Sequence, residues 1–142
     1  MFTTSHIHPM LVHFPIAFVV IGFVADFVHI FIKKEECFSK MGFYLLIVGT
    51  ISALATLLSG ILFTSEMSGT AGEVRETHET FAWVTVIILV IVSVLRTFVL
   101  IRKAENNLFK WLIFAMYGLA ALTVSITGFW GGTLVYNYMM PL

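Results

Sequence analysis

The sequence predicts an all-α integral membrane protein whose four transmembrane helices form an up-down-up-down bundle. Of its 142 residues, 59% are hydrophobic and only 11% are charged, whereas soluble domains carry about 25% charged residues. The mean hydropathy of +0.99 is too high for a surface that faces water. The net charge is zero, which argues against a nucleic-acid partner. The length fits one domain, residues 1–142.

Four apolar runs account for most of the chain and define the predicted helices. They cover residues 9–32, 41–64, 78–101 and 108–138. About 20 apolar residues cross a hydrocarbon layer of about 30 Å, and a segment in lipid must satisfy its backbone groups internally, so each run is expected to be a helix. The fourth run is longer than needed, which predicts a tilt or a last turn outside the bilayer. Short links make neighbouring helices antiparallel. No internal repeat is visible.

Basic residues are concentrated at one end of the predicted bundle. Seven of them lie there: Lys33, Lys34, Lys40, Arg96, Arg102, Lys103 and Lys110. Arg75 is the only basic residue at the other end, in an acidic segment between the second and third runs. Because cytoplasmic loops are enriched in Lys and Arg, we expect both termini on the outer side of a bacterial inner membrane. Lipid is then the first partner of this multi-pass chain.

Histidines mark the outer end. His8 and His13 lie at the start of the first helix and His78 opens the third. The first and third helices are diagonal in such a bundle, so we expect His13 and His78 to face each other across it. Ionisable residues inside membrane helices are functional candidates by default. An opposed imidazole pair suits the axial positions of a b-type haem, with His8 beside the pair or replacing one member.

Other outer-end residues fit the same haem hypothesis. Small residues of the second and fourth helices, including Gly131 and Gly132, are expected to leave a slot for a macrocycle. Arg75 is expected to pair with a propionate, while Trp130 and Tyr136 would form the walls.

The same end also permits two other interpretations. His8, His13 and His78, together with Glu66 or Glu79, make a mixed nitrogen and oxygen set for zinc, copper or another divalent ion. His8 and His13 point about 140° apart on an ideal helix, which is poor for chelation, although Pro15 is expected to kink the helix near His13. Alternatively, the chain is a cofactor-free accessory subunit of a membrane complex.

The inner end carries charged residues within the predicted helices. Asp26 and Arg96 lie at similar depth, and we predict a structural ion pair between them. His29 is close to Asp26, which leaves a proton-entry role as the alternative. A second haem is not expected, because no histidine lies at that depth on the third helix to pair with His29.

Two motifs resemble a known family. The run His8-Pro9-Met10-Leu11-Val12-His13-Phe14-Pro15-Ile16-Ala17 is similar to the opening HPxxVHFPIA signature of domain of unknown function 2231, a family of four-helix bacterial membrane proteins. Gly131-Gly132-Thr133-Leu134-Val135-Tyr136 is similar to its closing GGxLVY, although Thr133 stands where the family often has an acid. Relatives can be fused to cytochrome c-like or Rieske-type domains, so the resemblance implies a redox role.

We therefore expect a small b-type cytochrome-like electron-transfer protein with one haem between the first and third helices, near the outer face. Its partners would be a redox protein, other membrane subunits or further copies of the chain. This favours a non-enzymatic carrier or subunit over an enzyme, because two axial ligands leave no open position on the iron.

Overall fold

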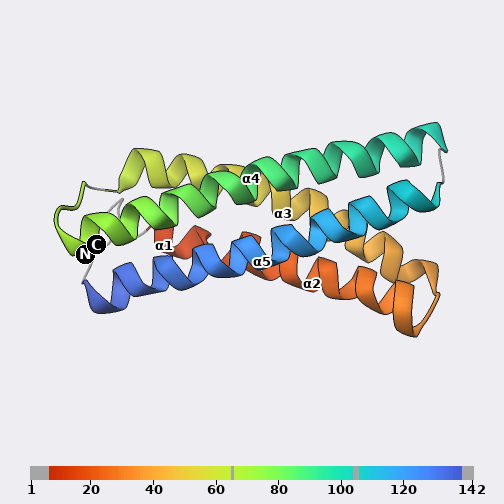
Figure 1. Ribbon diagram of the computed structural model, residues 1–142, viewed down its shortest axis with the longest axis horizontal. Coiled ribbons are helices and arrows are strands. Elements are labelled where there is room, and N and C mark those ends of the chain that lie inside the picture. The colour runs from red at the N-terminus through yellow and green to blue at the C-terminus, as the bar shows by residue number, and fades with distance from the viewer. Residues whose placement is uncertain (1–6, 65, 104–105, 139–142) are drawn as a thin grey trace.

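Four long helical rods lie side by side in the computed structural model, which describes residues 7–64, 66–103 and 106–138 (Figure 1). The elements follow in the order α1 (Ile7–Leu11), α2 (His13–Phe27), η2 (Val28–Ile32), α3 (Glu36–Phe63), α4 (Thr70–Arg102) and α5 (Asn107–Asn137). The first rod contains α1, α2 and the wider-wound η2. All four rods are long and apolar enough to cross a membrane. The predicted all-helical fold with four spans is thereby confirmed.

The rods are arranged as two antiparallel hairpins. α2 packs mainly against α3, and α4 packs mainly against α5. Thinner contacts of α2 with α5 and of α3 with α4 close the bundle, which leaves α2 and α4 diagonal. The start of α1, the α3–α4 connection and the end of α5 lie at one end (Figure 1). We call this the histidine end, because it contains His8 and His78, and the opposite one the basic end.

Two helices extend further than the hydropathy pattern predicts. α4 begins at Thr70 rather than at residue 78, and α3 begins at Glu36 rather than at residue 41. The added turns are polar, so a hydropathy criterion stops where the helix leaves the apolar layer although its backbone continues. The described part of the α3–α4 connection is therefore shorter than the predicted loop, and Arg75 lies on a helix.

Small residues allow the helices to approach closely. A Cβ atom on Gly22 would lie 2.0 Å from the hydroxyl oxygen of Tyr117, and one on Gly49 would lie 2.9 Å from a methyl group of Val19. Tyr117 and Val19 are fully buried. In lipid the association of helices relies on such van der Waals packing rather than on the hydrophobic effect. Gly22 therefore sets how closely α2 approaches α5, and Gly49 sets how closely α3 approaches α2.

The first rod is interrupted at Val12, between α1 and α2. Pro15 has no backbone N–H, so the carbonyl of Leu11 loses its partner within the helix. The hydroxyl of Thr56, on α3, donates to that carbonyl oxygen at 3.3 Å. The break is thus the expected consequence of Pro15, and a side chain of the neighbouring helix satisfies the freed group.

A buried ion pair joins three helices at the basic end. Arg96 on α4 donates from both terminal nitrogens to the carboxylate of Asp26 on α2, and from Nη2 to the carbonyl of Ser39 on α3 at 3.0 Å. The two charged side chains are only 11% and 9% exposed. The predicted Asp26–Arg96 pair is confirmed. His29 does not join it, because its Nδ1 donates to the carbonyl of Glu35 at 3.0 Å.

We expect Asp26→Leu to lower the free energy of unfolding by about 3–5 kcal/mol, because it leaves the Arg96 charge buried without a counter-ion. The double variant Asp26→Leu/Arg96→Met removes both charges and should recover most of that loss. Unfolding of the purified protein by increasing SDS in mixed micelles measures both values. Equal stability of the single variant and the parent would contradict a structural role for the pair.

Candidate cofactor site

A pocket of about 280 Å³ lies inside the histidine end, and all four rods line it. Most of the lining is aliphatic, including Ile16, Leu57 and Val86, and the pocket is partly open to its surroundings. The polar lining is contributed mainly by histidines, threonines, Arg75 and Glu79. An apolar cavity with a few convergent polar groups is the common form of a small-molecule or cofactor site.

His8 enters the pocket from α1. Its Nδ1 lies 3.2 Å from the carbonyl oxygen of Thr56 and 2.9 Å from the hydroxyl of Ser59, both on α3. A carbonyl can only accept, so we assign the ring proton to Nδ1. The ring lies over Gly60, where a Cβ atom would come within 3.0 Å of the imidazole. The half-buried imidazole is thus fixed in one tautomer and one orientation.

His78 enters from α4 in a matching way. Its Nδ1 donates to the carbonyl oxygen of Thr127, on α5, at 2.9 Å. Its ring lies over Gly131, where a Cβ atom would come within 3.1 Å. In each hairpin, therefore, a histidine of the first helix bonds to a threonine carbonyl of the second and packs on the glycine four residues after it. The two hairpins repeat one arrangement, although their sequences show no visible repeat.

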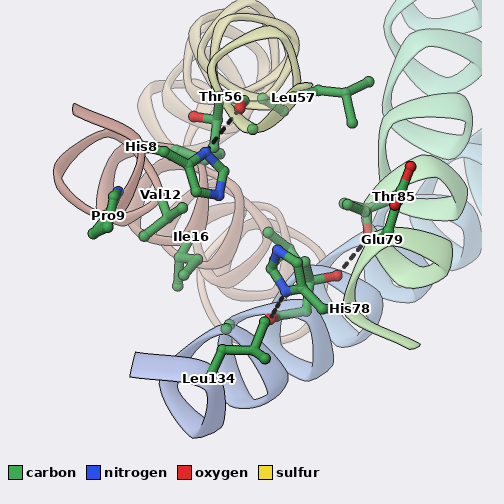
Figure 2. Close-up of a pocket in the computed structure, with 18 of the residues that line it drawn as sticks. His8, Pro9, Val12, Ile16, Thr56, Leu57, His78, Glu79, Thr85 and Leu134 are labelled. Atoms are coloured by element: carbon green, nitrogen blue, oxygen red, sulfur yellow. Dashed lines mark hydrogen bonds between the residues drawn. The ribbon is translucent and has the colours of Figure 1, made fainter. Parts of the chain in front are cut away.

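The free nitrogens of the two imidazoles point toward one another across the pocket (Figure 2). The ring centroids are 6.3 Å apart and the ring planes are nearly perpendicular, at 84°. Because each Nδ1 is engaged by a carbonyl, each Nε2 keeps its lone pair. A bond from the remote ring nitrogen to a carbonyl is the usual support of a metal-binding histidine. We call His8 and His78 the histidine pair.

The residue that faces His78 is therefore His8, and not His13 as the helix geometry predicts. His13 borders the pocket but is exposed. His8 and His13 point about 140° apart on an ideal helix, and Val12 between them keeps helical backbone angles. When His8 faces His78, His13 is therefore turned to another side of the rod. The sequence favoured His13 over His8 because His13 lies deeper in the predicted transmembrane helix.

The remaining predicted residues divide into two groups. Gly131, Gly132, Tyr136, Arg75 and Glu79 line the pocket. Trp130 is not among the lining residues, and its ring packs edge-on against Phe129. Glu66 does not line the pocket either. Its exposed carboxylate forms an ion pair with Arg75. Within the three described ranges, no three His, Cys, Asp or Glu side chains come together as a metal-binding group.

Sequence reasoning missed Thr56 and Thr127 as partners of the histidines. Both precede a glycine by four residues on a helix, and both are contacted by a histidine about fifty positions earlier in the chain. A search for this spacing in both hairpins would have found them.

The sequence profile of a family described as a predicted membrane protein, DUF2231, matches residues 4–141. The chain belongs to this family. Neither a curated protein nor a solved structure matches the chain significantly. Membership in DUF2231 therefore establishes a membrane protein, and the chemistry of the pocket has to be argued from its own residues.

Thr56 connects the helical break to His8, so we predict distinct effects for two substitutions there. Thr56→Val keeps the carbonyl that orients His8 but leaves the carbonyl of Leu11 unpaired. It should lower the free energy of unfolding by about 0.6 kcal/mol, the average for hydrogen bonds between membrane helices, and by no more than about 1.7 kcal/mol. Thr56→Ser keeps the hydroxyl and should cost less. Thermal unfolding in neutral detergent compares the two, and equal losses would show that the hydroxyl is unimportant.

Gly131 and Gly132 form a matched pair for testing the packing of His78. Gly131→Ala pushes a methyl group against the imidazole, and overpacking of this kind costs about 1–3 kcal/mol. Nothing lies within 4 Å of a Cβ atom at Gly132, so Gly132→Ala should be neutral or slightly stabilising through helix propensity. Thermal unfolding measures both. A Gly131→Ala variant as stable as Gly132→Ala would mean that His78 does not rest on Gly131.

Proposed function

We propose that this protein carries one b-type haem between His8 and His78 and passes electrons across the histidine end of the bundle. The observation that carries the proposal is the histidine pair, whose free nitrogens face each other at the spacing of two axial ligands. The haem would supply one-electron redox chemistry. The chain's own residues would hold the iron from both sides, orient the imidazoles and exclude water from the site.

The spacing supports two bonds to one metal. An imidazole nitrogen binds a metal at about 2.0–2.1 Å, so a metal held in line between two Nε2 atoms sets the ring centres roughly 6 Å apart. The observed separation is 6.3 Å. The perpendicular ring planes do not oppose this, because each ring can take any rotation about its own metal–nitrogen bond.

The number of protein ligands favours haem over a free divalent ion. A porphyrin supplies four nitrogens, so a six-coordinate iron needs only two protein ligands. Structural zinc sites use four protein ligands and catalytic ones three, whereas no three-residue group of suitable ligands occurs in the described ranges. His13 and Glu79 border the pocket but do not complete such a set, so the zinc or copper alternative has weaker support.

The mainly apolar lining of the pocket suits a macrocycle, but its volume limits how much of a haem it can enclose. About 280 Å³ is near the lower limit of small-molecule pockets, which measure about 300–1,000 Å³. A haem would therefore have to extend through the open side. Arg75 lines the pocket and would meet a propionate there. Because Gly60 and Gly131 have no side chains, the two imidazole rings pack directly on α3 and α5, and this contact helps to fix their orientation.

The distribution of basic residues indicates how the chain is oriented in the membrane. Seven basic residues lie at the basic end and Arg75 alone at the other, so we place the histidine end and both termini on the outer face of a bacterial inner membrane. Electrons would then pass between an outer redox partner and a quinone or another membrane subunit. With His8 and His78 both held to the iron, a bound haem would have no open position, so the site would suit electron transfer rather than bond-making catalysis.

A haem titration of the purified protein tests the proposal. Haemin added to the parent should give the Soret shift of a low-spin, six-coordinate iron, with a sharp α-band after reduction. His8→Ala and His78→Ala should each abolish the low-spin spectrum and weaken binding by at least about tenfold, on the scale of losses at metal-ligand shells. His13→Ala is the matched control, because this exposed histidine borders the same pocket, and it should leave the spectrum unchanged.

Two results would overturn the proposal. One is a parent protein that forms neither a Soret shift nor a pyridine haemochrome, which favours the cofactor-free accessory subunit. The other is a low-spin spectrum that survives in His8→Ala or His78→Ala, which would place the iron elsewhere. Circular dichroism and gel filtration of each variant show whether it is folded, and elemental analysis detects zinc or copper bound in place of iron.

A further inference from the structure

Three features of Arg75 are not accounted for by its position on α4. Its side chain is only 21% exposed, it lines the pocket of the histidine pair, and its Nη1 lies 2.7 Å from the Oε2 atom of Glu66. The Glu66 side chain is 95% exposed and belongs to the non-helical segment before α4. A largely buried cation at a pocket wall is thus paired with a carboxylate that water surrounds.

The two sides of this ion pair differ in what holds them. Arg75 is fixed on α4, one turn before His78 and Glu79. Glu66 lies outside the helices and does not line the pocket. An ion pair with one exposed partner contributes little, about 0–1 kcal/mol, so another carboxylate can replace Glu66 at small cost. Arg75 also lines the pocket, so a carboxylate presented by a ligand there would compete with Glu66 for the same guanidinium.

We propose that Arg75 is the carboxylate-binding subsite of this pocket, and that Glu66 occupies it until a ligand carboxylate replaces it. The ligand class is an apolar ring or chain that carries a carboxylate. If the proposed function holds, on which this assignment of the ligand rests, the carboxylate is a haem propionate. The apolar lining takes up the body of the ligand, and the planar guanidinium is suited to bidentate binding of its carboxylate.

Metal-free porphyrins test this subsite without relying on iron. Protoporphyrin IX carries two free carboxylates, whereas its dimethyl ester has the same ring and none. Their fluorescence reports binding to the full chain in nanodiscs of neutral phosphatidylcholine, with empty nanodiscs as the blank. We expect the parent to bind the diacid more tightly than the ester. Arg75→Gln should weaken binding of the diacid roughly tenfold and leave the ester unchanged.

The Glu66 variant tests the exchange itself. Glu66→Gln removes the competing carboxylate and should tighten binding of the diacid several-fold, with no effect on the ester. Glu76→Gln is the matched control, because it removes the same charge from an exposed residue beside Arg75 on α4 that does not line the pocket. An equal gain in Glu76→Gln would show that the effect comes from the general negative charge of this end, and it would overturn the exchange.

Further outcomes separate this subsite from the haem proposal. Equal affinity of the parent for diacid and ester, or no binding of either porphyrin, overturns the subsite. Haemin can still give a low-spin spectrum through the histidine pair in the first of these cases, so the proposed function survives it. Conversely, an Arg75-dependent preference for the diacid without low-spin haemin retains the subsite and removes the haem function.

Discussion

The carbonyl of Leu11 is the group on which the geometry of the histidine end depends. Pro15 deprives it of its helical partner, and in the apolar layer an unpaired backbone group is costly. Thr56 supplies the missing donor from α3. The carbonyl of the same residue accepts a hydrogen bond from Nδ1 of His8. One threonine therefore ties the broken helix to its neighbour and at the same time determines where the imidazole points.

The second hairpin reaches the same geometry without a break. His78 bonds to the carbonyl of Thr127 and rests on Gly131, but α4 is continuous around it. The shared requirement is a helix carbonyl that can accept a further hydrogen bond, next to a residue without a Cβ atom. Glycine four residues after each threonine provides this, because a helical side chain covers the turn N-terminal to its own Cα. Two unrelated helix sequences thus hold two imidazoles in equivalent positions.

Much of this architecture was predictable, because it depends on composition and on distance along the chain. The four spans follow from hydropathy, the diagonal placement of α2 and α4 from short links, and the Asp26–Arg96 pair from equal depth in helices that had to satisfy both charges. The break at Val12 follows from Pro15.

What could not be predicted depends on the direction of single side chains. The choice between His8 and His13 depends on which side of the first rod faces the bundle, because the two histidines point about 140° apart on an ideal helix. Hydropathy does not give that side in a helix that is apolar all round. The earlier start of α4 was missed for another reason: hydropathy measures the thickness of the apolar layer and not the length of a helix. Arg75 was expected to meet a ligand, and only the structure shows that Glu66 already pairs with it.

The two ends of the bundle differ in how completely their polar groups are used. At the basic end the Asp26 carboxylate and the Arg96 guanidinium bind each other, and Arg96 also reaches the carbonyl of Ser39. That arrangement holds helices together, and neither side chain lines the pocket of the histidine end. At the histidine end each imidazole uses one nitrogen to attach to a neighbouring helix and presents the other to the pocket. A purely structural histidine needs only the first of these bonds. Two free nitrogens directed toward each other across a mainly apolar pocket are what a ligand between them would require.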